Sequence, residues 1–263
     1  MSGPPGVDGQ TDRLLPWTRA LVVGGTSGIG EAIARQLAST GIRVSVIGRR
    51  EERLQQIADD LNREGAEPLV LPFAHDVRET NEIPVLFQEI VDRLGGLDLV
   101  VYAPGVLPPI GPREFPTETD LNTIAVNLAG AVAWLNEAAD RFGRAGRGTI
   151  VGISSVAGDR GRRGNPVYNA SKAGLDTYLE ALRARLAVRG VTIVTVKPGY
   201  VRTAMLENNP PGPLPVSDPE VVAAEILDAA AAGKRVVYIP GWWRIIMAVT
   251  RMIPAPIFER LSF

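Results

Sequence analysis

The sequence predicts an α/β protein in which helices flank both faces of a doubly wound parallel sheet. Short apolar runs that read as buried strands alternate with longer segments of helical periodicity along most of the chain. The first such run leads through a glycine-rich turn into a helical segment. Over 263 residues no shift in composition marks a second domain, so one large domain is expected at residues 19–240.

Composition excludes several classes of function. The chain has no cysteine and a single histidine, His75, so we expect no disulfide, no metal site and no histidine-based catalytic triad. The formal net charge of −1 gives no electrostatic footprint for nucleic acid. Residues 1–18 are predicted to be a flexible tail and not a signal peptide, and no apolar run is long enough to span a bilayer. A cytoplasmic protein is the default expectation.

The first predicted strand and helix carry a nucleotide-binding pattern. The apolar run 20–23 is followed by Gly24-Gly25-Thr26-Ser27-Gly28-Ile29-Gly30 and then by a helical segment, 31–38. Glycines allow a tight turn and close approach of the backbone, and free amides at a helix N-terminus attract a pyrophosphate. This context of strand, turn and helix favours a dinucleotide site over an ordinary glycine turn.

The second predicted strand, residues 44–47, indicates which dinucleotide binds. An NAD-binding chain usually ends this strand with an acidic residue that binds the ribose hydroxyls. Here the strand is followed by Gly48-Arg49-Arg50, and two guanidinium groups suit a ribose 2′-phosphate. We therefore expect NADP(H); the alternative is that both arginines begin a solvated helix.

The alternation continues through the middle of the chain. Asp76, which follows the third strand, is placed to accept a hydrogen bond from an adenine amino group, and its neighbour His75 is interpreted as structural. Asn127 lies in an apolar part of a long helix, where it either bonds a backbone carbonyl and bends the helix or holds a water in a proton relay. The predicted elements are helix 53–64, strand 69–71, helix 81–94, strand 97–102 and helix 119–142.

Residues 149–174 carry the chemistry. A β-branched run at 149–153 predicts a buried strand, and Ser155 follows its end. A helix is predicted from Pro166, with Asn165 as its N-cap and no breaker before Gly174. Tyr168 and Lys172 are four residues apart on this helix, so they share one face at a spacing of about 6 Å along the axis.

Such a trio can transfer protons. A phenol has a pKa near 10, and a nearby ammonium favours the phenolate. Lowering that pKa by ~3 requires roughly 4 kcal/mol of differential interaction, part of which a nicotinamide positive charge can supply. Tyr168 then becomes a general acid/base, and the Ser155 hydroxyl holds the substrate oxygen. A Tyr-x-x-x-Lys pattern by itself is common on ordinary helices, so its significance here depends on the other motifs of the chain.

The remaining elements complete the domain. Residues 191–196 form a sixth strand that leads into Lys197-Pro198-Gly199-Tyr200-Val201-Arg202-Thr203. A proline- and asparagine-rich segment, 204–218, predicts a mobile flap, and a helix at 220–232 and a last strand at 236–239 follow.

In this order, Gly24-x-x-x-Gly28-x-Gly30, Asn127, Ser155 and Tyr168-x-x-x-Lys172 resemble the short-chain dehydrogenase/reductase family over roughly residues 20–238. The resemblance implies a single-domain Rossmann fold. It also implies that Tyr168 is the catalytic acid/base, that Lys172 lowers its pKa and binds the nicotinamide ribose, that Ser155 polarises the substrate oxygen, and that Asn127 completes a proton relay.

The same resemblance implies NADP(H)-dependent hydride transfer to or from a small-molecule ketone or secondary alcohol, as in a carbonyl reductase, and assembly as a homodimer or homotetramer. A catalytically silent NADP(H)-binding sensor or scaffold and a sugar-nucleotide epimerase-like enzyme stay open as alternatives. The expected cofactor-binding residues are Gly24, Thr26, Ser27, Gly28, Ile29, Gly30, Arg49, Arg50, Asp76, Val77, Ala103, Gly105, Tyr168, Lys172, Pro198, Gly199, Val201 and Thr203.

The sequence departs from the family pattern at two places. Val23 stands where the family usually has threonine, and Tyr102-Ala103-Pro104-Gly105 replaces the usual Asn-Asn-Ala-Gly. Both departures concern local packing of the central sheet and cofactor affinity, and both leave the catalytic trio intact.

Two further features lie outside the family core. Three arginines in the loop 159–163 either attract an anionic substrate group or form a solvated, salt-bridged loop. The C-terminal extension, 241–263, contains an apolar helix at 242–253 that needs burial on most sides. This helix is expected to serve an oligomer interface, to roof a lipophilic pocket or to make a peripheral membrane contact. We expect a substrate with a sizeable apolar part.

Overall fold

The computed structural model describes residues 15–62, 68–111, 113–207, 209, 211 and 214–261. Its centre is a parallel sheet with the strand order β3-β2-β1-β4-β5-β6-β7, which confirms the predicted doubly wound α/β fold. The strands are β1 (Arg19–Val23), β2 (Arg43–Gly48), β3 (Val70–Ala74), β4 (Leu99–Tyr102), β5 (Gly148–Ile153), β6 (Val191–Pro198) and β7 (Val236–Ile239).

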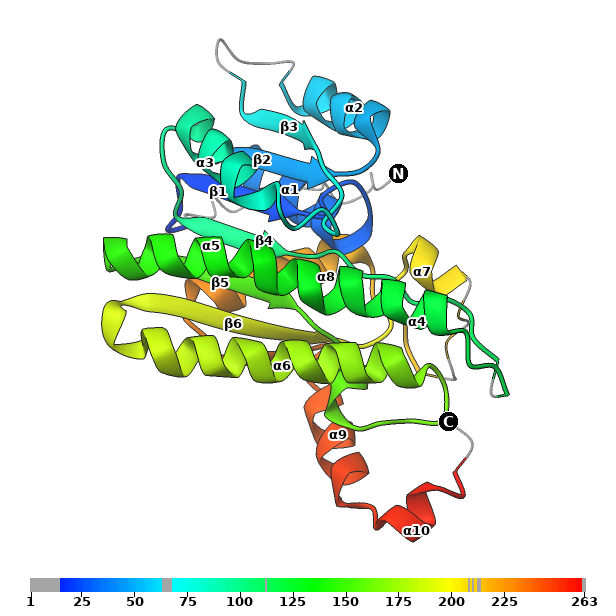
Figure 1. Ribbon diagram of the computed structural model, residues 1–263. Helices are drawn as coiled ribbons and strands as arrows, with labels where there is room; N and C mark the ends of the chain where they lie inside the picture. The colour runs from blue at the N-terminus through cyan, green and yellow to red at the C-terminus, as the bar shows by residue number, and fades with distance from the viewer. Residues whose placement is uncertain are drawn as a thin grey trace, which may run out of the picture.

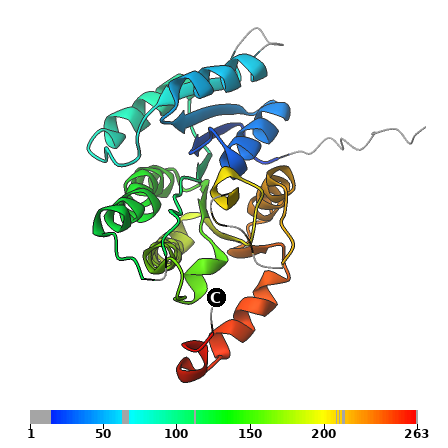
Figure 2. The ribbon, with the colours of Figure 1, turned by 90° about the vertical axis from the view of Figure 1, so that its right-hand side faces the viewer.

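Helices cover both faces of this sheet (Figures 1 and 2). On one face lie α1 (Gly28–Ser39), α2 (Glu51–Leu61) and α8 (Pro219–Ala231). On the other face lie α3 (Ile83–Leu94), α4 (Thr117–Ile124), α5 (Gly130–Ala145) and α6 (Pro166–Leu186). The remaining helices are α7 (Ala204–Glu207), α9 (Trp243–Met252) and α10 (Ala255–Phe258).

The strands read as continuous apolar runs because both of their faces are buried. Along β1, Ala20 and Val22 pack into the core under α1 and α8, whereas Leu21 and Val23 pack into the core under α3, α5 and α6. Residues just beyond the strands therefore gather at the carboxyl edge of the sheet, which is where a doubly wound fold binds its ligands.

The domain begins slightly before the predicted boundary. Trp17 is buried, and its indole Nε1 donates a hydrogen bond to Thr149 Oγ1 at 3.1 Å, so the last residues of the predicted tail are part of the fold. Residues 1–14 lie outside the described residues. Of the predicted flap, residues 204–207 form α7 and Ser217 forms a bridge with Val201, while residues 208, 210, 212 and 213 lie outside the described part.

The start of α6 differs from the expectation. Asn165 occupies the N-cap position, but its backbone is left-handed with φ of 50° and its side chain makes no capping hydrogen bond, because the preceding loop turns sharply at this residue. The helix also continues through Gly174 to Leu186. A Cβ on Gly174 would come within 2.9 Å of Leu128 Cδ2, so this glycine permits close helix packing and does not end the helix.

The unusual Tyr102 has a structural role. The α4–α5 segment contains a π-helical turn, Ala125–Ala129, which alters the normal hydrogen-bond ladder. The buried Tyr102 hydroxyl donates to the Val126 carbonyl at 2.7 Å, and burial raises the pKa of this phenol, so it stays a donor. A Cβ on Gly130 would come within 2.8 Å of the same hydroxyl. The departure from the family pattern therefore joins β4 to the π-helical turn.

We expect Tyr102→Phe to lower the free energy of unfolding by about 1–3 kcal/mol, because it leaves the Val126 carbonyl buried without its donor. The matched control is Tyr178→Phe, whose hydroxyl is only half-buried and donates to Asn136 Oδ1 at 2.9 Å, so the change should cost less than about 1 kcal/mol. Urea denaturation of both variants measures the difference. Equal losses would contradict the structural role of Tyr102.

Candidate active site

One cavity of about 1420 Å³ lies at the carboxyl edge of the sheet. The strand order reverses between β1 and β4, so the loops after these strands diverge and leave a crevice. The structure brings every site residue expected from the sequence to the lining of this cavity, with the exception of Asn127.

The glycine turn after β1 forms one end of the cavity. A Cβ on Gly30 would come within 2.2 Å of the Gly24 carbonyl oxygen, and a Cβ on Gly28 within 2.9 Å of Thr203 Cγ2. Gly24 and Gly28 also have positive φ. The N-cap residue of α1, Ser27, makes no side-chain capping hydrogen bond, so the amides of the first turn face an anion site without a competing acceptor. The turn thus fits the pyrophosphate of a dinucleotide.

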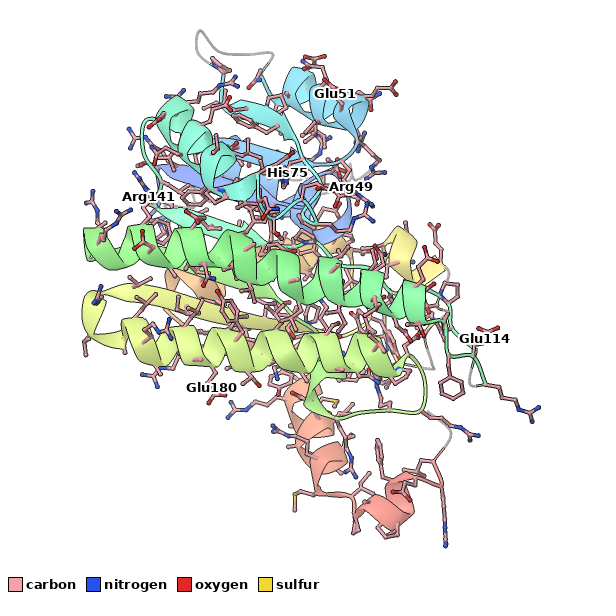
Figure 3. The ribbon with its side chains drawn as sticks, viewed as in Figure 1. Arg49, Glu51, His75, Glu114, Arg141 and Glu180 are labelled. Atoms are coloured by element: carbon pink, nitrogen blue, oxygen red, sulfur yellow. The ribbon has the colours of Figure 1, made fainter. Side chains whose placement is uncertain are left out.

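The two arginines after β2 have different surroundings. The Arg50 guanidinium donates to the Thr26 carbonyl at 3.0 Å and to Thr26 Oγ1 at 3.2 Å, so it holds the glycine turn against β2. The Arg49 side chain is 61% exposed and has a distant ion pair, 3.9 Å, with Asp76. Figure 3 shows Arg49 at the end of the sheet, close to the start of α2 at Glu51. Arg49 is therefore the guanidinium better placed to receive a phosphate.

Asp76 already has a strong partner within the chain. Arg78 Nη2 donates to Asp76 Oδ2 at 2.6 Å, and this hydrogen bond holds the pKa of Asp76 below its usual value, with burial acting in the opposite direction. The carboxylate lines the cavity, so its predicted contact with an adenine amino group stays a prediction. Next to it, His75 is buried with its ring 5.6 Å from that of Trp134 in an edge-on contact.

Ser155, Tyr168 and Lys172 form the other end of the cavity. Lys172 is 3% exposed, and its Nζ donates to the Ile153 carbonyl at 3.0 Å. The same nitrogen lies 5.8 Å from the centre of the Tyr168 ring. Ser155 Oγ accepts from the Ala157 amide at 3.1 Å at the start of a short 3₁₀ turn, Val156–Asp159, which directs the hydroxyl toward Tyr168.

The electrostatics of this trio differ from the expectation. Burial raises the pKa of Tyr168, while the hydrogen bond from Ser155 and the charge of Arg162 act to lower it. Lys172 is not among the groups that lower the pKa of Tyr168 in the chain alone, and burial lowers the pKa of Lys172 itself to about 8, with the charge of Asp176 acting against this. Additional positive charge in the cavity would favour the phenolate.

A buried ionic cluster lies behind Lys172. It consists of Asp159, Asp176, Lys197 and Tyr238. Lys197 Nζ contacts Asp159 and lies 2.8 Å from Asp176, and the Tyr238 hydroxyl donates to Asp159 Oδ2 at 2.8 Å. Burial raises the pKa of Asp176, with the Lys197 hydrogen bond acting against it. The cluster joins α6, β6, β7 and the loop after β5, and it fixes the helix that carries Tyr168 and Lys172.

Asn127 supports the cavity from outside its lining. Its Oδ1 accepts from the Val106 amide at 2.8 Å, and its Nδ2 donates to the Val106 carbonyl at 3.0 Å and to Ser171 Oγ at 3.1 Å. Asn127 therefore bonds a backbone carbonyl, which was one of the two expectations. This carbonyl belongs to the loop after β4. A part in a proton relay stays a prediction.

Several lining residues are not among the expected site residues, although a helix at 242–253 that roofs a lipophilic pocket was one of the expectations. The apolar segment 107–110 lines the outer part of the cavity together with Met205 and Trp243. Its Leu-Pro-Pro-Ile pattern in the loop after β4 was the available signal. Trp243 belongs to α9, and a Cβ on Gly199 would come within 1.8 Å of its Nε1. No local pattern predicts that α9 folds back onto Gly199.

The arginine loop after β5 serves two roles. Arg160 binds the C-terminal end of α9 through the carbonyls of Thr250 and Ile253, both at 2.6 Å, which agrees with the structural interpretation of this loop. Arg162 lines the cavity, and Arg163 is exposed at the surface. One of the three arginines is thus placed to meet a substrate.

Comparisons with known proteins agree with this geometry. Residues 18–213 match the family model described as short chain dehydrogenase. The chain is 32% identical over 246 residues to an uncharacterised oxidoreductase of Myxococcus xanthus, covering 93% of this chain and 96% of the relative. It is 33% identical over 255 residues to an uncharacterised oxidoreductase of Streptomyces coelicolor, covering 95% and 98%.

A solved structure has the same arrangement of elements. A variant of actinorhodin polyketide ketoreductase with NADPH superposes with a TM-score of 0.75 at 30% identity, covering 86% of this chain and 97% of that one. With a family match over most of the chain and relatives above 30% identity along nearly their whole length, the protein belongs to the short-chain dehydrogenase family and is an oxidoreductase of that type.

Proposed function

We propose that this protein is an NADP(H)-dependent oxidoreductase that transfers hydride between the nicotinamide and a ketone or secondary alcohol. One observation carries the proposal: a single cavity has the glycine turn and Arg49 at one end and Ser155, Tyr168 and Lys172 at the other. A dinucleotide reaches from one end to the other in proteins of this fold.

The preference for NADP(H) rests on Arg49. Its exposed guanidinium follows β2, where an NAD-binding chain carries an acidic residue, and guanidinium groups bind phosphate through charge-assisted hydrogen bonds. A related ketoreductase was solved with NADPH, which supports the same choice. When bound, the cofactor supplies or accepts the hydride; the residues of the chain bind it, orient it and move the proton.

Ser155, Tyr168 and Lys172 are the residues that handle the proton. In the reductive direction, the Ser155 hydroxyl donates a hydrogen bond to the carbonyl oxygen, and Tyr168 gives its phenolic proton to that oxygen as negative charge develops there. In the oxidative direction, the phenolate takes the proton back. The buried Lys172 ammonium stabilises the phenolate and offers donors to a ribose, while Asp176 helps Lys172 to keep its proton.

The outer lining supports a substrate with an apolar part. Leu107, Pro108, Ile110, Met205 and Trp243 all line the cavity, and Arg162 lines it as well, close enough for its charge to lower the pKa of Tyr168. Apolar walls with a few placed polar groups are typical of small-molecule sites. The substrate therefore carries an apolar body next to its carbonyl or alcohol.

We expect Tyr168→Phe to reduce the turnover number for ketone reduction by about 10²–10⁴-fold, because it removes the proton donor and leaves the cavity otherwise unchanged. NADPH oxidation across a ketone panel measures turnover, and fluorescence titration measures NADPH binding, which should persist. Tyr178→Phe, on the same helix, is the matched control. If the wild type binds NADPH but reduces no ketone in a broad panel, the silent-sensor alternative holds instead.

Arg49→Gln should weaken NADPH binding by about ten- to a hundredfold and leave NADH binding unchanged, because the lost charge-assisted hydrogen bond involves only the 2′-phosphate. Isothermal titration with both cofactors measures this split, and NADH serves as the internal control. A parallel loss for both cofactors would show that Arg49 acts through the fold and not through the phosphate.

Lys172→Met tests the buried ammonium. The pKa of Lys172 is about 8 instead of 10.5, so the folded chain carries the cost of a buried charge below pH 8, and this cost disappears as the pH rises toward 10.5. Without cofactor, the variant should therefore be more stable than the wild type. Its free energy of unfolding should be higher by up to ~3 kcal/mol at about pH 7, and the difference should be smaller at about pH 10. Urea denaturation at both pH values measures the gain. The exposed Lys234→Met is the control, and a pH-independent gain would refute the explanation.

A further inference from the structure

The last part of the described chain forms an arm, defined here as residues 241–261, which consists of α9 and α10. The arm projects from the edge of the domain beyond β6 and α6 (Figures 1 and 2). The chain covers only one face of α9. Trp243 and Met247 on that face are buried and pack in a small apolar cluster with Val156, Tyr200 and Tyr238.

The opposite face of α9 is apolar and exposed. Ile245 is 70% exposed, Val249 is 59% exposed and Met252 is 82% exposed. These residues stand at positions i, i+4 and i+7, so they form one stripe along the helix. Ile257 on α10 is also exposed. The expectation that most sides of this helix are buried is therefore not met within the chain, and a stripe of this kind marks an interaction surface.

The arm carries more positive than negative charge. Residues 241–261 contain Arg244, Arg251 and Arg260 and one acidic residue, Glu259, although the whole chain has a formal charge of −1. Arg244 and Arg251 are exposed on the same helix as the stripe. An apolar face flanked by arginines is typical of a helix that lies in the plane of an anionic membrane surface.

The arm is held in place before it meets any partner. Arg160 donates to the last carbonyls of α9, and its guanidinium lies 3.8 Å from the centre of the Phe258 ring on α10. A cation at a helix C-terminus is favourable, and the stacking adds to it. Because the arm is already ordered, little conformational entropy is lost when it docks.

We propose that the arm is a docking surface for an anionic lipid bilayer, with Ile245, Val249, Met252 and Ile257 turned toward the acyl chains and the arginines at the headgroups. A second copy of this chain fits the stripe less well. A two-fold contact over α9 would bring Arg244 and Arg251 of both copies together, and α9 itself has no acidic residue to offset them. Among the described residues no helix is long and apolar enough to cross the bilayer, so the contact is peripheral.

Docking of the arm would also place part of the cavity near the lipid. Trp243 of α9 lines the cavity, so a docked arm holds this lining residue close to the lipid surface. This consequence rests on the proposed function and its apolar substrate, whereas the docking itself does not.

Vesicle flotation of the full chain tests the proposal. The protein should float with vesicles of phosphatidylcholine mixed with phosphatidylglycerol, should not float with phosphatidylcholine alone, and should bind less as salt is added. Ile245→Asp and Val249→Asp should each weaken binding about tenfold or more, because a buried apolar contact becomes a buried charge. Arg244→Gln with Arg251→Gln should reduce the dependence on anionic lipid.

The control is Val188→Asp, which adds the same charge at a valine that is 93% exposed in the short 3₁₀ turn Ala187–Arg189, far along the chain from the arm. Flotation of this variant should match the wild type, and NADPH binding and melting temperature should be unchanged in all variants. Absence of flotation with anionic vesicles overturns the proposal. So does an oligomer that dissociates in Ile245→Asp without any lipid binding by the wild type, since a second copy would then cover the stripe.

Discussion

The buried ammonium of Lys172 is the interaction on which the arrangement of the site depends. A lysine in this position is costly, as its lowered pKa shows, and the chain offsets the cost with the Ile153 carbonyl and with Asp176 one turn along the same helix. Asp176 is itself buried and needs Lys197, which in turn contacts Asp159. Each charge therefore requires the next, and the chain of contacts ties α6 to β6, to β7 through Tyr238, and to the loop that carries Ser155.

The loop after β4 also packs closely against its neighbours, and it does so with residues that depart from the family pattern. The glycine turn must lie close to this loop, since a Cβ on Gly24 would come within 2.7 Å of the Pro104 nitrogen. Where the family usually has two asparagines, the Tyr102 hydroxyl bonds the Val126 carbonyl, while Asn127 holds both backbone groups of Val106. Both contacts join β4 and its loop to the π-helical turn, but only the Tyr102 contact comes from a residue that departs from the family pattern.

The sequence predicted the features that depend on local pattern and could not predict those that depend on tertiary contacts. Apolar runs located the strands, and the carboxyl edge of a parallel sheet then gathered Gly24, Arg49 and Ser155 around one cavity. The left-handed backbone of Asn165 and the π-helical turn at Asn127 follow from neighbouring segments and leave no periodic signal. The raised pKa of Tyr168 likewise follows from burial, which the spacing to Lys172 does not report.

The two ends of the cavity are built in different ways, one from backbone in the glycine turn and the other from side chains. The cofactor end is made largely of backbone at Gly24, Gly28 and Gly30, where an added Cβ would come within 3 Å of a neighbouring atom, so the turn depends on glycine at these positions. The substrate end is made of side chains from loops and from the arm, among them Leu107, Met205 and Trp243. These side chains lie outside the sheet, so under the proposed function a change in them would alter the substrate pocket without disturbing the strands. Both proposals therefore involve α9: its Trp243 lines the cavity, and its exposed face is the proposed docking surface.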